Sequence, residues 1–150
     1  MKTYLLSLCA TALFLTACHQ DNEHPSVSEN VRERQIAFKV MGGDMTLLSN
    51  MINGTSTFDM QKLQQQANEF AQHATRPFQY FGEQDQGGNS KPNIWLERHA
   101  FDMERDKFLS AVEHFNTAAQ AGEFEQIRAT FKPIGDSCKS CHNVFKAKSN

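Results

Sequence analysis

The most constraining feature of this 150-residue chain is the pattern Cys-Lys-Ser-Cys-His over residues 138–142. On a helix, Cys138 and Cys141 lie three residues apart on the same side, and His142 follows directly. C-x-x-C-H is the attachment pattern of a c-type haem, in which each sulfur bonds a vinyl-derived carbon of the porphyrin. One porphyrin edge can then be attached while the histidine nitrogen reaches the iron. The pattern predicts one covalent haem c, with His142 as an axial ligand of the iron.

Two other interpretations of the cysteine pair lack the companion features that they need. A zinc site would need a second Cys/His pair at ligand spacing, and the sequence holds no other C-x-x-C. A thioredoxin-like redox pair would need surrounding β-strands, and the pattern of the chain predicts none. A haem-free binding module, whose thiols hold a metal or cycle as a disulfide, is kept as a hypothesis below.

The first 17 residues have the features of a secretory signal peptide, with one positive charge at Lys2, an apolar stretch and small residues before Cys18. Residues 15–18, Leu-Thr-Ala-Cys, also resemble a bacterial lipobox, which predicts that Cys18 is lipidated and that residues 18–28 form a flexible tether. An ordinary signal peptide is the alternative. The expected location is the periplasm of a Gram-negative bacterium, with membrane attachment through the lipid only. His19, in place of an aspartate, favours the outer membrane.

Apolar residues recur at alternating steps of three and four in four segments, which is the period of amphipathic helices. The expected helices cover residues 31–52, 60–74, 101–121 and 124–145, and residues 78–93 form a long loop. Four such helices predict an all-α fold, an antiparallel four-helix bundle, in one domain over residues 29–150. Both cysteines lie on the apolar stripe of the last helix, so the haem should face the bundle interior.

The expected ends of these helices depend on a few residues. Ser56 or Thr57 is the expected N-cap of the second helix, and Pro77 marks its end. Gly54 and Gly122 should end the first and third helices. Pro133 predicts a kink or a break near residues 130–132, because a proline inside a helix costs ~3 kcal/mol.

Composition and missing motifs exclude several classes of function. The formal net charge is −2 and no basic cluster is present, so nucleic acid is not an expected partner. No catalytic triad, paired carboxylates or phosphate-binding loop is visible, so the protein is not expected to be an enzyme. Twelve phenylalanines and six methionines, against two tyrosines, suggest a core built around a large apolar group. His73, His99 and His114 lie among polar residues and are expected at the surface.

Three stretches of the chain resemble the class II cytochromes c, and most closely the cytochrome c′ family. They are Arg34-Gln35 with Phe38 and Met41-Gly42, Lys91-Pro92-Asn93-Ile94-Trp95, and Gly135 to Lys146 around the haem motif. The resemblance covers residues 31–146 and implies a four-helix bundle with covalent haem. Two features depart from the family pattern: Phe145 and Lys146 stand where tyrosine and arginine are common, and the lipobox is unusual. Lysine lacks the planar fork of arginine, which puts a role in gating proximal ligands in doubt.

The resemblance also implies roles for single residues. Phe38 takes the position that faces the distal side of the iron, and a phenylalanine has no lone pair to donate. Arg34 is expected to reach a haem propionate, with a solvated arginine as the alternative. Trp95 is expected at the haem edge, or as a simple cap of the third helix, and Lys146 in the proximal pocket.

Three functional hypotheses follow. In the first, five-coordinate high-spin iron, with His142 proximal and Phe38 distal, binds nitric oxide or carbon monoxide and can also take part in electron transfer. In the second, Met41 or Met45 is the sixth ligand, and the protein is a low-spin electron carrier. The third is the haem-free binding module. The expected partners are NO or CO, a redox partner protein and, by resemblance, a second copy of the chain in a homodimer.

Overall fold

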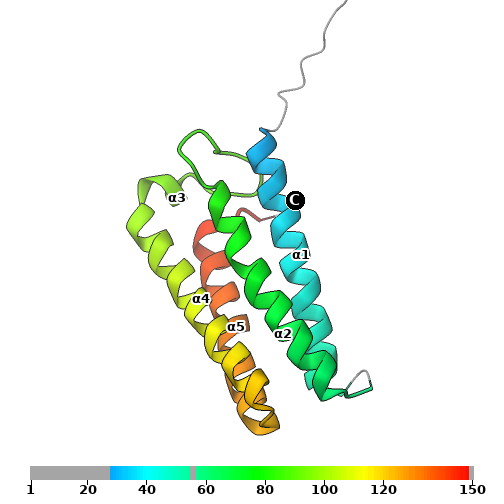
Figure 1. Cartoon of the computed structure of the whole chain (residues 1–150). Helices are drawn as coiled ribbons and strands as arrows, with labels where there is room; N and C mark the ends of the chain where they lie inside the picture. Colours follow the sequence, from blue (N-terminus) through cyan, green and yellow to red (C-terminus); the bar gives the residue numbers. More distant parts are fainter. Residues whose placement is uncertain (1–27, 55–56, 149–150) are drawn as a thin grey trace, which may run out of the picture.

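The computed structural model describes residues 28–54 and 57–148 and has four long helices, as Figure 1 shows. These are α1 (Glu29–Ile52), α2 (Met60–Thr75), α4 (Arg98–Ala121) and α5 (Phe124–Phe145). Two short elements lie between α2 and α4, namely the 3₁₀ helix η1 (Arg76–Tyr80) and the one-turn helix α3 (Asn93–Leu96). Successive long helices run antiparallel along the bundle (Figure 1). The predicted all-α four-helix bundle is confirmed.

The helix ends follow ordinary capping chemistry, with one difference from expectation. Ser28 caps α1 by accepting a hydrogen bond from the Val31 N–H at 3.2 Å. Asp59 caps α2 by accepting from the Lys62 N–H at 3.1 Å. The prediction of Thr57 or Ser56 as the α2 N-cap is therefore wrong, and Ser56 itself lies outside the described residues. An aspartate caps a helix as well as serine or threonine does, so residue type alone could not place this cap.

Pro133 does not break α5, which runs unbroken from Phe124 to Phe145. Of the predicted kink or break near residues 130–132, the break is therefore wrong, and the kink stays a prediction. Pro133 lies on the exposed face of the helix, while Ile127 and Ile134 are fully buried on the inner face. Burial of these two side chains holds both halves of α5 on the bundle, which offsets the missing backbone hydrogen bond.

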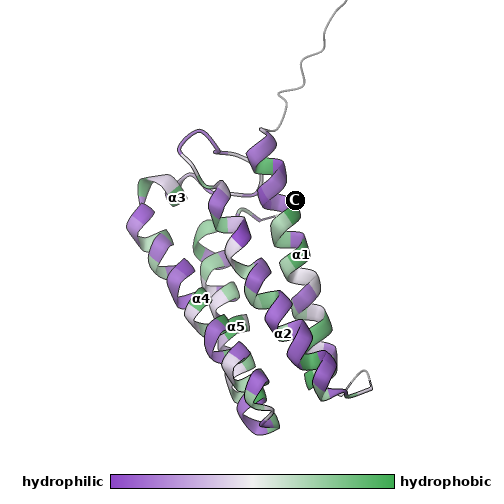
Figure 2. Cartoon of the chain, viewed as in Figure 1, coloured by the Kyte–Doolittle hydropathy of each residue, from purple (hydrophilic) through white to green (hydrophobic). Residues whose placement is uncertain are grey.

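The core consists of two packed clusters. The larger one runs along the bundle and contains Met41, Leu48, Ile52, Leu63, Ala67, Phe70, Ala74, Phe108, Val112, Phe115, Ala118, Ala119, Ile127 and Ile134. The second cluster, of Phe81, Ile94, Phe101 and Phe145, lies where α3, the start of α4 and the end of α5 meet. Figure 2 shows polar residues on the outer faces of α2 and α4, as expected for amphipathic helices. No helix among the described residues has the length and apolar character needed to cross a membrane.

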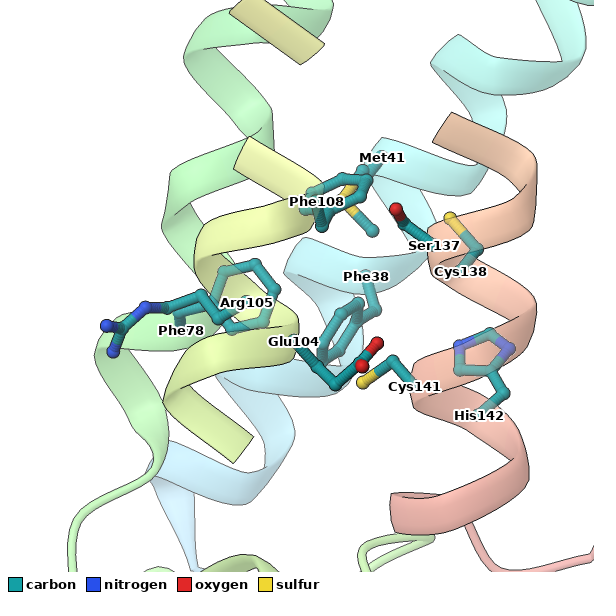
Figure 3. Close-up of a pocket in the computed structure, with 10 residues that line it drawn as sticks. All are labelled: Phe38, Met41, Phe78, Glu104, Arg105, Phe108, Ser137, Cys138, Cys141 and His142. Carbon is teal, nitrogen blue, oxygen red and sulfur yellow. The ribbon is translucent and has the colours of Figure 1, made fainter. Parts of the chain in front are cut away.

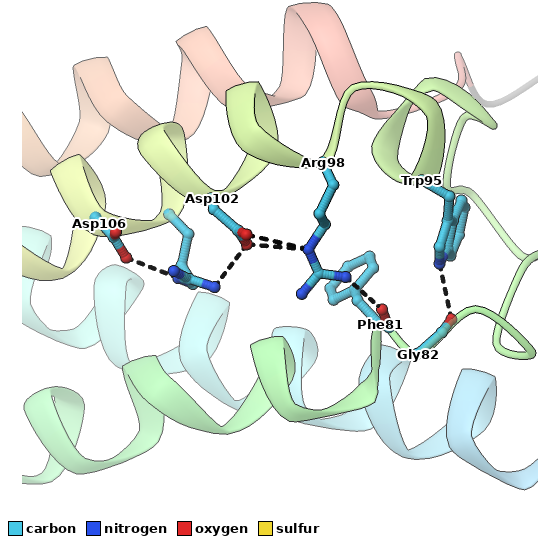
Figure 4. A network of polar contacts seen from close by, with 7 residues as sticks. Phe81, Gly82, Trp95, Arg98, Asp102 and Asp106 are labelled. Carbon is cyan, nitrogen blue, oxygen red and sulfur yellow. Dashed lines mark hydrogen bonds and ion pairs between the residues drawn. The ribbon is translucent and has the colours of Figure 1, made fainter.

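The irregular part of the connection between α2 and α4 is shorter than the predicted loop over residues 78–93, because it covers residues 81–92. η1 includes residues 78–80, and α3 begins at Asn93. Figure 4 shows two hydrogen bonds that tie the remaining loop to the bundle: the Trp95 indole donates to the Gly82 carbonyl, and the Arg98 guanidinium donates to the Phe81 carbonyl, both at 2.7 Å. Gly88 has a φ of +60° and packs so close to α1 that a Cβ would lie 2.8 Å from a Gln35 side-chain atom. The loop therefore needs glycine at this position.

Candidate haem site

A cavity of about 50 Å³ lies between α1, η1, α4 and α5 beside the Cys-x-x-Cys-His segment (Figure 3). It is lined by Phe38, Met41, Phe78, Glu104, Arg105, Phe108, Ser137, Cys138, Cys141 and His142. The walls are mainly aromatic and apolar, and all three residues of the predicted haem attachment are part of them. The structure thus brings Phe38 to the same cavity as the cysteines and the histidine, although about 100 residues separate them.

The two cysteines are half-buried free thiols on the inner side of α5. Burial raises the pKa of the Cys138 thiol above its ordinary value. Burial, followed by the negative charge of Glu104 and by Cys138, raises the pKa of Cys141 to about 11. Reactive and metal-binding cysteines have lowered pKa values, because the thiolate is the reactive form. Both thiols are therefore protonated at neutral pH, which argues against a reactive thiolate pair.

His142 follows the cysteines on the last turn of α5 and is exposed. Partial burial of the ring, followed by the positive charge of Lys146, lowers the pKa of His142 below its ordinary value. The imidazole is therefore neutral at pH 7, and a neutral imidazole has the nitrogen lone pair that an iron ligand needs. No group of three or more His, Cys, Asp and Glu residues in the described part of the chain could hold a metal ion by itself.

Phe38 and Met41 both reach the cavity from α1. Phe38 makes edge-to-face contacts with Phe78 and Phe81, with ring centroids 5.9 and 6.2 Å apart. Met41 is 8% exposed and belongs to the larger core cluster. Met45, the other methionine considered as a sixth ligand, packs against that cluster but does not line the cavity.

Arg34 is buried under the loop that follows η1. Its side chain donates hydrogen bonds to the backbone carbonyls of Tyr80 at 2.8 Å, Asp85 at 2.9 Å and Gly87 at 2.9 Å. The guanidinium also lies 4.4 Å from the centroid of the Phe81 ring. Burial lowers the pKa of Arg34, and the charge of Asp85 partly offsets this effect. The alternative of a solvated arginine is wrong, because the residue is only 2% exposed; contact with a propionate stays a prediction.

The other two predicted site residues lie around the cavity and not in its lining. Trp95 packs on Phe81, with ring centroids 6.2 Å apart, in the second core cluster, to which Phe38 and Cys141 also contribute. Lys146 is exposed, follows the end of α5 and forms an isolated β-bridge with Ser90. Their roles at the haem edge and in the proximal pocket stay predictions.

Three polar features were missed at the level of sequence. Glu104 lines the cavity. Its position on the stripe between Phe101 and Phe108 could have indicated this from the sequence. The Lys91 ammonium donates to the carbonyls of Asn143 at 3.2 Å and Val144 at 3.1 Å, at the end of the haem-bearing helix.

The third missed feature concerns a histidine outside the cavity. His73 is half-buried, and its Nδ1 lies 2.8 Å from a carboxylate oxygen of the buried Asp44. The surface prediction is confirmed for His99 and His114, which are exposed, and holds in part for His73, whose side chain is 39% exposed.

The residues around the cavity suit a c-type haem, although the cavity is small. Pockets for small molecules usually measure ~300–1,000 Å³, so the aromatic walls must separate to admit a porphyrin. The side chains present fit each part of a haem: two protonated thiols for the vinyl groups, a neutral imidazole for the iron and apolar side chains for the macrocycle. Glu104 Oε2 is buried without a hydrogen-bond partner among the described residues, and such an atom usually has a partner.

Comparison with known proteins matches this chain to one family. The family model described as Cytochrome C′ matches residues 29–146. A cytochrome c′ of Rubrivivax gelatinosus is 29% identical over 121 residues, which cover 79% of this chain and 94% of that protein.

Solved structures agree with this match. The nitric oxide complex of a mutant of cytochrome c prime from Alcaligenes xylosoxidans is similar to this chain, with a TM-score of 0.78, 26% identity and coverage of 80% and 94% of the two chains. A carbon monoxide-bound variant from the same organism has a TM-score of 0.77, 26% identity and coverage of 79% and 94%. The predicted resemblance and the predicted cofactor are confirmed. The chain belongs to the cytochrome c′ family, which binds one covalently attached haem c.

Proposed function

We propose that this protein binds nitric oxide or carbon monoxide at five-coordinate, high-spin haem iron, with His142 as the only protein ligand. The observation that carries the proposal is the position of Phe38, which lines the cavity next to Cys138, Cys141 and His142. A phenyl ring cannot coordinate iron, and it excludes water and polar groups from the distal side. The similar structures with bound nitric oxide and carbon monoxide support the choice of ligands.

The residues of this chain divide the task between the two faces of the haem. Cys138 and Cys141 would hold the porphyrin through thioether bonds, and His142 would supply a nitrogen ligand to the iron. The bound haem would supply an iron that takes diatomic ligands and changes between ferric and ferrous states. Phe38 packs edge-on against Phe78 and Phe81, so a ligand can enter only when these rings shift. An apolar distal side offers no hydrogen bond to polarised bound oxygen, which favours nitric oxide and carbon monoxide.

The second candidate is a six-coordinate, low-spin electron carrier, and the position of Met41 is the observation that favours it. Met41 lines the same cavity one turn after Phe38, and its thioether could reach the sixth position. Met45 is a poorer candidate because it does not line the cavity. Electron exchange with a redox partner protein is compatible with either coordination number.

Absorption spectra of the purified holoprotein decide between the two candidates. A broad reduced visible band that sharpens and shifts on addition of carbon monoxide is expected for the open site. A sharp reduced α band that carbon monoxide leaves unchanged would overturn the proposal.

Phe38→Met should convert the spectrum to a low-spin form, whereas Met41→Leu, the matched control on the same helix, should leave it unchanged. If the parent protein is low-spin and Met41→Leu loses the low-spin spectrum, Met41 is instead the sixth ligand.

For the cellular location we propose the periplasm, with the chain anchored through lipidated Cys18. Support comes from the signal peptide over residues 1–17 and from the chemistry of covalent haem attachment, which in bacteria takes place outside the cytoplasmic membrane. The signal peptide, Cys18 and most of the tether over residues 18–28 lie outside the described residues. Mass spectrometry of the mature N-terminus tests the proposal, because a mature chain that starts at an unmodified residue other than Cys18 contradicts it.

A further inference from the structure

Glu104 places a carboxylate inside the cavity where the haem attaches. Its side chain extends from α4 towards the Cys141 sulfur and Phe38, as Figure 3 shows. Glu104 Oε2 is buried and has no hydrogen-bond partner among the described residues. A carboxylate in such surroundings usually has a partner, because burial of an unsatisfied charge or acceptor is costly.

The neighbouring cation does not neutralise this carboxylate. The Arg105 guanidinium donates to Asp102 at 2.6 Å and to Asp106 at 2.8 Å, and it points away from the cavity (Figure 3). Two aspartates therefore hold the nearest arginine on the outer side of α4.

Attachment of the haem at Cys141 would bring this carboxylate to the edge of the macrocycle. The sulfur of Cys141 would bond a vinyl-derived carbon of the porphyrin, and a carboxylate that faces this sulfur would then face the haem edge. A ferric haem carries one more positive charge than a ferrous haem, and a nearby negative charge stabilises the ferric form. The effect is strong in apolar surroundings, where water screens little.

We propose that Glu104 is an electrostatic tuning residue that lowers the reduction potential of the haem by stabilising the ferric state. The residue acts through its charge and is not a ligand of the iron. The inference rests on haem attachment at Cys141 and does not depend on whether the iron is five- or six-coordinate, so failure of the gas-binding proposal would leave it intact.

A redox titration of the holoprotein at neutral pH, in which an electrode supplies one electron for each iron, tests the proposal. Glu104→Gln keeps the shape and removes the charge, and Glu104→Asp keeps the charge. Glu113→Gln is the matched control, because Glu113 is exposed on the same helix. Glu104→Ala is a second neutral variant in case the glutamine variant loads haem poorly. Haem content and helical circular dichroism show that each variant is folded.

The expected result is a positive shift of the midpoint potential in Glu104→Gln and in Glu104→Ala. Glu104→Asp should stay close to the parent protein, and Glu113→Gln should not shift measurably. Two results would overturn the proposal. Equal midpoint potentials for the parent protein and both neutral variants would show that the charge of Glu104 does not act on the iron. A shift in Glu104→Asp as large as that in Glu104→Gln would show that packing, and not charge, is responsible.

Discussion

At the scale of single residues, Arg34 shows how a buried cation orders the loop beside the haem site. Its three hydrogen bonds to carbonyls of the loop, together with its stacking on Phe81, connect the first turns of α1 to the segment between η1 and α3. Phe81 in turn packs against Phe38. Arg34 therefore supports the side of the cavity on which Phe38 lies, and its contact with a propionate stays a prediction.

Arg34→Lys should destabilise the protein by roughly 2–4 kcal/mol, because a single ammonium cannot satisfy three separated carbonyls and leaves buried acceptors unpaired. Urea denaturation followed by circular dichroism measures the change in the free energy of unfolding. Arg32→Lys is the control, because Arg32 is exposed on the same helix and should change stability by less than about 0.5 kcal/mol. Equal stabilities of the two variants would mean that the bonds to the loop contribute nothing.

Residue roles could be predicted from sequence only where a residue lies on a regular stripe. Phe38, Cys138 and Cys141 lie on apolar stripes, and helical periodicity alone places them in the interior. Arg34 and Glu104 are charged residues at interior positions, and their partners come from distant loops or from the cofactor. No spacing rule within the chain indicates such partners, so these roles became visible only in three dimensions.

At the scale of elements, the segment just before α3 pairs with the end of α5 and so joins distant parts of the chain beside the haem motif. The Lys91 N–H donates to the Phe145 carbonyl at 2.9 Å, and the Ala147 N–H donates to the Asn89 carbonyl at 2.9 Å. The Lys91 ammonium bonds two more carbonyls in the last turn of α5. A positive charge at this position also interacts favourably with the helix dipole. The turn that carries His142 is therefore held from outside its own helix.

Lys91→Met should lower the free energy of unfolding by about 1 kcal/mol, because the last carbonyls of α5 lose a charged donor. Lys132→Met is the control: Lys132 pairs with Asp136 at 2.6 Å, but both side chains are largely exposed. Surface pairs of this kind contribute little to stability, because water screens the two charges. Thermal unfolding of both holoproteins compares them directly. A larger loss in Lys132→Met than in Lys91→Met would contradict the capping role.

Sequence periodicity predicted the long helices well and the short elements poorly. The stripes of α1, α2, α4 and α5 repeat over at least four turns, so errors at single positions cancel. η1 and α3 are too short to show a period and depend on contacts with the rest of the bundle. The break predicted at Pro133 also depends on contacts outside the local sequence. Burial of Ile127 and Ile134 outweighs the free-energy cost of a proline inside the helix.

At the scale of the whole molecule, the outer face of α1 carries an apolar stripe that no other part of the described chain covers. Ile36, Val40 and Leu47 are 47%, 43% and 52% exposed, and their spacing places them on one side of the helix. Gly43 lies between them in the sequence with open space around it, so a second helix could approach closely there. Such a stripe suits the homodimer that the family resemblance predicts.

Val40→Glu should convert a dimer to a monomer, because a symmetric interface would bring two buried carboxylates close together. Sedimentation velocity of the holoprotein at several concentrations measures the change in mass. Met103→Glu is the matched control, since Met103 is 60% exposed on α4 and lies outside the α1 stripe. This variant should remain a dimer, and the visible spectrum of both variants should match that of the parent protein. A monomeric parent protein, or dissociation of Met103→Glu as well, would show that the α1 stripe is not the dimer interface.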